Sequence, residues 1–135
     1  MKKINFELRE LLRSNTATKL GINNEPTTIS IYQNLFDLII YLLQPIREGI
    51  GKPVKISSGY RCRELNKVVG GVENSNHLFG LAADINNGSR NNEELFKWIS
   101  KHRNELPINE LILGKNSSYV HVSLSTKKLS VMLNQ

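Results

Sequence analysis

Apolar residues in the first third of the chain recur at the three- and four-residue spacing of amphipathic helices. This spacing predicts short helices over residues 6–12 and 14–20 and a longer helix over residues 31–46. Gly21 is expected to end the second helix. Pro45 is expected to kink or end the third, because proline removes a backbone donor and clashes with the preceding turn. The long helix should therefore supply much of the core.

Farther along the chain, apolar and polar residues alternate or form short apolar runs, as is typical of strands. Strands are predicted over residues 54–57, 81–85, 111–113, 119–124 and 129–133. Short helices are expected over residues 65–69 and 95–99. Helices come first and strands dominate later. Strands and helices do not alternate along the chain, so a parallel sheet is not expected. The expected fold class is α+β, with N-terminal helices packed on a small antiparallel sheet.

Length and composition are those of a compact globular protein. The 135 residues suit one domain over residues 1–135, and 39% hydrophobic with 22% charged residues argues against extended disorder. The most apolar run, residues 35–43, is far shorter than the roughly 20 residues that span a membrane, so no membrane insertion is expected. We expect a monomer.

The N-terminus, the cysteine content and the charge narrow the function further. Residues 1–7 contain basic residues but no apolar run, which predicts synthesis in the cytoplasm without a signal peptide. Cys62 is the only cysteine, so any metal must bind histidine and carboxylate rather than paired cysteines. A net charge of +6 suits an anionic partner such as a cell-wall polymer, nucleic acid or lipid. The basic residues do not alternate with aromatic ones as in single-strand binders, so nucleic acid is not expected.

Histidine and carboxylate occur at a spacing that suits a metal. His77 and Asp84 flank Gly80, which permits a close approach between a loop and a strand. In the strand predicted over residues 119–124, alternation places His121 on the face away from the core. Two imidazoles and one carboxylate suit tetrahedral zinc with an open fourth position. Taken singly, each of these residues would more often be solvated or structural.

The sequence around these residues resembles the zinc peptidases that include D-alanyl-D-alanine carboxypeptidases and phage endolysins, the peptidase M15-like family. The similar segments are Ser58-Gly59-Tyr60-Arg61, Ser75-x-His77-x-x-Gly80-x-Ala82-x-Asp84 and Tyr119-Val120-His121-Val122-Ser123. Residues 14–26 also resemble the N-terminal helical element of the phage and prophage branch. The resemblance therefore covers most of the chain.

The resemblance implies a zinc metallopeptidase with Zn²⁺ bound by His77, Asp84 and His121. The expected reaction is hydrolysis of an amide bond in peptidoglycan stem peptides, by a D,D-carboxypeptidase or an endolysin-type endopeptidase. The partner would be a bacterial cell-wall peptide, and the place of action the cell wall, during phage lysis or as part of a virion. Loop shape, rather than these motifs, decides which bond is cut.

Three further residues are expected to contact substrate. Arg61 corresponds to the arginine of the family that orients a substrate carboxylate or carbonyl, which makes it both a catalytic and a substrate-binding candidate. Its planar fork of donors can bind a carboxylate in two places or stabilise charge on a scissile carbonyl. Ser75 and Tyr119 are the other substrate-binding candidates. Ser75 is also expected to hold the loop of His77 through its hydroxyl, although an ordinary loop serine is the alternative.

The sequence departs from the family at the general base. The endolysin pattern has an acid three positions before the last histidine, where Ser118 stands, and the carboxypeptidase pattern has a histidine at the position of Asn116. Neither the serine hydroxyl nor the asparagine amide can act as a general base near neutral pH. Glu110 is the nearest acid by sequence and the remaining catalytic candidate, with a solvated strand-start carboxylate as the alternative. A non-catalytic zinc-containing phage module that binds cell-wall peptides is therefore the alternative function.

Overall fold

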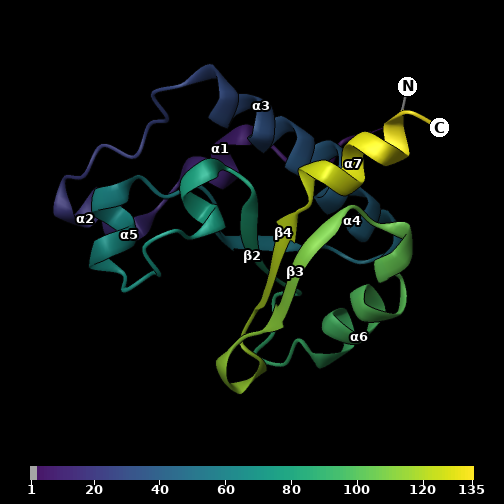
Figure 1. The fold of residues 1–135 in the computed structure, drawn as a ribbon. Coiled ribbons are helices and arrows are strands. Elements are labelled where there is room, and N and C mark those ends of the chain that lie inside the picture. Colours follow the sequence, from purple (N-terminus) through teal and green to yellow (C-terminus); the bar gives the residue numbers. More distant parts are fainter. Residues whose placement is uncertain (1–2) are drawn as a thin grey trace.

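The computed structural model describes residues 3–135, and the strands in this range form one antiparallel sheet of four strands (Figure 1). The strands are β1 (Lys55–Ser58), β2 (Ala82–Asn86), β3 (Ile108–Leu113) and β4 (Val120–Leu124), in the order β1-β2-β4-β3. The α-helices are α1 (Leu8–Leu12), α2 (Asn15–Leu20), α3 (Ile29–Asp37), α4 (Gln44–Ile50), α5 (Arg63–Val68), α6 (Glu93–Lys101) and α7 (Thr126–Leu133). The α+β class expected from the sequence is confirmed.

The helices before the sheet begin and end where local chemistry dictates. Ser14 caps α2 by accepting a hydrogen bond from the Ala17 amide at 3.1 Å, and Gly21 ends it in the left-handed conformation at φ 69°. Figure 1 shows α1, α2 and α5 at the left of the sheet, and α4, α6 and α7 at its right.

Among residues 3–135, no helix combines the length and apolar character needed to cross a bilayer.

The long predicted helix does not end at Pro45. It runs without a break from α3 through a π-helical turn, Leu38–Leu43, into α4, which Gly51 ends at φ 69°. In the π turn the Gln44 amide bonds to the carbonyl of Ile39, five residues earlier. This wider turn explains why the proline is tolerated, because a proline ring clashes with the carbonyl four residues before it in a regular α-helix.

The hydrophobic core lies between this long helix and one face of the sheet. The helix contributes fully buried leucine and isoleucine side chains, namely Leu35, Leu38, Leu42, Leu43 and Ile46. The sheet contributes Ile85 from β2 and Val120 and Val122 from β4, all 0% exposed. Fully burying a side chain of this size stabilises the fold by about 1.5–3 kcal/mol. The opposite face of β2 and β4 carries Asp84 and His121.

The strand predicted over residues 129–133 is wrong, because this segment lies within α7. The Ser125 hydroxyl caps the helix by accepting a hydrogen bond from the Lys128 amide at 3.1 Å. Leu129 is buried, whereas Val131 and Leu133 are 58% and 55% exposed. The short apolar alternation predicts a strand, but the cap and the one buried leucine support a helix.

Candidate metal centre

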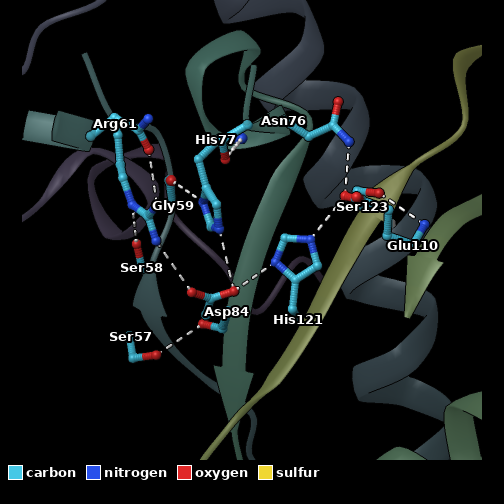
Figure 2. Close-up of polar contacts among 12 residues, drawn as sticks. Ser57, Ser58, Gly59, Arg61, Asn76, His77, Asp84, Glu110, His121 and Ser123 are labelled. Carbon is cyan, nitrogen blue, oxygen red and sulfur yellow. Dashed lines mark hydrogen bonds and ion pairs between the residues drawn. The ribbon is translucent and has the colours of Figure 1, made fainter. Parts of the chain in front are cut away.

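Asp84 and His121 are brought together by the register of the two central strands. They lie directly opposite each other in the antiparallel pair β2–β4, so their side chains share one face of the sheet. The neighbouring pairs, Ala83 with Val122 and Ile85 with Val120, point to the core. Nδ1 of His121 lies 2.9 Å from Oδ1 of Asp84 (Figure 2).

His77 reaches the same carboxylate from a 3-10 turn, Asn76–Phe79, that precedes β2. Ser75 caps this turn, since its hydroxyl accepts a hydrogen bond from the His77 amide at 3.2 Å. Gly80 ends it at φ 73°, and a Cβ there would lie 2.9 Å from the Ile31 carbonyl oxygen. A side chain at this position would thus be both strained and obstructed. The turn buries the His77 ring and places its Nε2 3.3 Å from Oδ1 of Asp84.

One potential ligand atom from each of His77, Asp84 and His121 lies within 4.8 Å of the others. A hydrogen bond on the outer side of each ring selects its tautomer. Nδ1 of His77 lies 2.6 Å from the Gly59 carbonyl oxygen, and Nε2 of His121 lies 2.9 Å from Oε1 of Glu110. When a cation replaces the hydrogen bonds to Asp84, a proton on each outer nitrogen leaves Nε2 of His77 and Nδ1 of His121 able to present their lone pairs to it. This donor set suits zinc, and such outer bonds are typical of metal-binding histidines.

The charges around the cluster favour an ionised carboxylate pair. Burial by itself raises the pKa of Asp84, but hydrogen bonds from His121 and His77 outweigh it and lower this pKa to about 2. Burial also raises the pKa of Glu110, and bonds from His121, Asn76 and Ser123 reverse the effect and lower it. For His121, burial lowers the pKa, whereas Asp84 and Glu110 together raise it. Negative charge beside two imidazoles is the arrangement that attracts a cation.

Arg61 lies on the opposite side of Asp84 from His121 (Figure 2). Its Nη2 is 3.6 Å from Oδ2 of Asp84, whereas both histidines face Oδ1. Nε donates a hydrogen bond to the Ser58 hydroxyl at 3.3 Å, and Nη1 donates to Oδ1 of Asn66 at 3.0 Å. Arg61 also lines a cavity of about 520 Å³ beside β1, together with Arg13. The Arg61 side chain therefore contacts Asp84 and also borders this cavity.

Glu110 faces the cluster because β3 contains a bulge. Ile108 pairs with Leu124 whereas Leu111 pairs with Val122, so β3 has one extra residue in this stretch. Within the bulge, the Glu110 amide donates to the Ser123 hydroxyl at 2.9 Å. The carboxylate oxygen Oε1 accepts hydrogen bonds from Asn76 at 2.8 Å and from His121 at 2.9 Å (Figure 2). Glu110 thus contacts the ring of His121 on the side away from Asp84.

Comparison with known proteins agrees with this geometry. The family model described as peptidase M15 matches residues 4–123. The chain belongs to the peptidase M15 family. The resemblance inferred from the motifs is thereby confirmed. A zinc D-Ala-D-Ala carboxypeptidase from Streptomyces albus G is 34% identical over 88 residues, which are 64% of this chain and 33% of that protein. The match therefore spans about a third of the relative's length.

In this M15 chain the residues at the two positions expected for a base lie in the loop between β3 and β4. Ser118 is exposed and its hydroxyl donates to the Lys115 carbonyl at 2.7 Å. Asn116 adopts a left-handed conformation at φ 57° in the same loop. Tyr119, a substrate-binding candidate, packs its ring against Gly114, where a Cβ would lie 2.4 Å from the ring. Within residues 3–135, no hydrogen bond links these three side chains to the cluster.

Sequence reasoning missed the groups that hold the site residues in place. Asn66 bonds to Arg61, Asn76 and Ser123 bond to Glu110, and the Gly59 carbonyl bonds to His77. Gly59, Asn76 and Ser123 lie inside the motifs, so proximity in sequence could have suggested them. Asn66 carried no such signal, because an asparagine in a helix is common at any position.

Proposed function

We propose that this M15-family chain, as a single domain over residues 1–135, is a zinc-dependent peptidase that hydrolyses an amide bond in peptidoglycan stem peptides. The reaction would be that of a D,D-carboxypeptidase or an endolysin-type endopeptidase at the bacterial cell wall. One observation carries the proposal: potential ligand atoms of His77, Asp84 and His121 converge within 4.8 Å. Family membership and the name of the Streptomyces relative support it.

In the proposed centre, zinc is held by Nε2 of His77, a carboxylate oxygen of Asp84 and Nδ1 of His121. Zinc is the metal that two imidazoles and one carboxylate favour in a hydrolytic site. When bound, it supplies a Lewis acid that polarises the scissile carbonyl and lowers the pKa of water. The Gly59 carbonyl and Glu110 bond to the outer ring nitrogens and would hold the two rings with their inner nitrogens facing the metal.

Arg61 is proposed to bind the carbonyl oxygen or carboxylate of the substrate. Its side chain is only 15% exposed, and its guanidinium is held by Ser58, Asn66 and Asp84 before any substrate arrives. A donor that is already in place costs little reorganisation when negative charge develops on the carbonyl oxygen. Ser75 is proposed to act by holding the His77 turn, and Tyr119 by bordering the substrate from the neighbouring loop.

Glu110 is proposed to position His121 rather than to accept a proton from water. Its Oε1 already receives two hydrogen bonds, from His121 and Asn76. The lowered pKa of Glu110 also makes it a weak base, because a carboxylate stabilised by donors holds a proton less readily. A carboxylate that orients a ligating histidine is a common outer partner in zinc sites.

The second candidate function is a non-catalytic zinc-containing phage or prophage module that binds cell-wall peptides. The observation in its favour is the absence of a titratable side chain at Ser118 and Asn116, where the family patterns have their base. A positioned proton acceptor usually contributes about 10²–10⁴-fold to the rate. Both functions need the same cluster and differ in turnover.

Mass analysis of purified peptidoglycan fragments separates these functions. Fragments are incubated with zinc-loaded protein, with protein treated with a chelator, and with the zinc-loaded His102→Ala variant as a control. His102 lies outside the cluster, and its Nδ1 contacts the Trp98 carbonyl at 2.8 Å. We expect a defined mass loss or new fragment with the first and third samples only. Unchanged fragments in every sample, together with binding of the protein to intact peptidoglycan, would establish the binding module instead.

A further inference from the structure

Asn66, on α5, is a buried side chain that the proposed chemistry leaves without a role. It is 4% exposed, and both ends of its amide are engaged. Nδ2 donates to the Val72 carbonyl at 2.8 Å, and Oδ1 accepts from Nη1 of Arg61 at 3.0 Å. A buried amide with both ends satisfied is held in one orientation. Its oxygen is therefore aimed at Arg61.

The guanidinium of Arg61 is held at each of its nitrogens by a different group. Ser58 accepts from Nε, Asn66 accepts from Nη1, and Nη2 faces Asp84. Ser58 and Asp84 both come from the sheet, on β1 and β2. Asn66 is the contact from outside the sheet, and it opposes rotation of the planar group away from Asp84. A hydrogen bond to a charged group is stronger than one between neutral groups.

Gly71 closes the space behind this pair. A Cβ at Gly71 would lie 2.1 Å from Oδ1 of Asn66 and 2.8 Å from Nη1 of Arg61. The backbone amide of Gly71 also donates to the Asn66 carbonyl at 2.8 Å. The neighbouring Gly70 differs, since a Cβ there would meet nothing within 4 Å although its φ is 76°. A glycine is thus needed at position 71 because a side chain would collide with Asn66 and Arg61. At position 70 a glycine is needed because the backbone is left-handed.

We propose that Asn66 is a positioning residue that fixes the guanidinium of Arg61 beside Asp84, with Gly71 as the surface against which the pair packs. Asn66 acts through Arg61 and does not itself contact the substrate. The catalytic consequence rests on the proposed function, whereas the positioning itself does not. A donor whose orientation is released must be reordered in the transition state, which lowers turnover.

The first test needs no substrate and measures hydrogen exchange at Nη1 of Arg61, the nitrogen that donates to Asn66, by NMR. Asn66→Ala and Gly71→Ala should each accelerate this exchange by at least about tenfold, as expected when a bond to a charged group is lost. Gln44→Ala and Gly70→Ala are the controls. Gln44 is another buried amide, 2% exposed, which ties α4 to Lys3 and Asn5. Unchanged exchange in Gly71→Ala would overturn the proposal, even if Asn66→Ala does not fold.

The second test is a double-mutant cycle on peptide hydrolysis. Asn66→Ala and Gly71→Ala should each lower kcat by about tenfold with little change in KM and with zinc retained by elemental analysis. In an Arg61→Ala background, Asn66→Ala should change kcat by less than about twofold, because residues that act as a unit are not additive. The same tenfold loss in that background would overturn the proposal. Asn66→Asp keeps an acceptor for Arg61 but loses the donor to the Val72 carbonyl, so it should restore only part of the rate.

The two tests separate failure of this proposal from failure of the proposed function. If the zinc-loaded wild-type protein cleaves no stem peptide, the peptidase assignment fails while the exchange measurement still decides the role of Asn66. If peptides are cleaved but the exchange rate and the cycle show no coupling, the peptidase assignment stands and Asn66 only stabilises the fold.

Discussion

The two faces of the β2–β4 strand pair serve different purposes with the same backbone. On one face, Ala83, Ile85, Val120 and Val122 are all 0% exposed and pack against the long helix. On the other, Asp84 and His121 lie opposite each other, and their side chains contact polar partners from three other segments of the chain. Neighbouring residues along either strand therefore alternate between a position in the core and a position in the candidate metal site.

The faces also tolerate change differently. Apolar contacts on the core face are numerous and non-directional, so losing one costs free energy in proportion to the cavity that is left. On the site face each polar atom has one or two named partners, and the geometry fails when a partner is removed. Substitutions on the core face should thus alter stability and spare zinc, and substitutions on the site face should do the reverse.

The largest effect is expected from removing a proposed ligand. His77→Ala or His121→Ala leaves two ligands, and we expect loss of stoichiometric zinc by elemental analysis and loss of measurable turnover. His102→Ala is the matched control. Its ring stacks on Trp98 at a centroid distance of 4.0 Å, and this variant should keep one zinc per chain. Full zinc retention in both ligand variants would refute the ligand assignment.

Arg61→Ala should lower turnover by several hundredfold, about the scale reported for losing one transition-state donor. Zinc content and the unfolding midpoint should stay close to those of the wild type, because Arg61 contacts Asp84 through Oδ2 and not through Oδ1. Steady-state kinetics on a stem peptide and elemental analysis make the test. Equal turnover would remove Arg61 from the catalytic site, and loss of zinc would make it a structural support of Asp84.

Ile85→Ala tests the core face one residue from Asp84. Ile85 is 0% exposed, and its truncation should lower the free energy of unfolding by about 2–5 kcal/mol. Urea titration measures this loss, and elemental analysis of the folded protein should still find one zinc. A variant that lost zinc without losing stability would contradict the assignment of stability to the core face and zinc binding to the site face.

The smallest effect is expected at Glu110, and it distinguishes positioning from proton transfer. Glu110→Gln keeps an oxygen that can accept from Nε2 of His121, so we expect less than about a tenfold loss of turnover. Glu110→Ala removes that acceptor and should lose more activity, and some zinc affinity with it. Equal and larger losses in both variants, with zinc still bound, would instead identify Glu110 as the base.

Much of the fold and of the cluster could be predicted because both depend on local patterns. Period-two alternation around His121 specifies which face of a strand each side chain occupies, whatever the strand pairs with. The spacing of His77, Gly80 and Asp84 likewise joins a turn to a strand within one short segment. The class of fold, the donor types and their place on the sheet therefore followed from neighbours in the chain.

The remaining features depend on strand pairing, helix capping and side-chain packing, which the apolar pattern does not encode. The bulge that aims Glu110 at His121 is a property of how β3 pairs with β4, and no spacing within β3 encodes it. The cap at Ser125 outweighs the apolar alternation of residues 129–133, and a π turn accommodates Pro45 inside the long helix. The bond from Arg61 to Asn66 requires the close approach of Gly71, which the apolar pattern does not indicate. Only the folded chain decides these, because side-chain direction and cavity shape arise when separate elements pack.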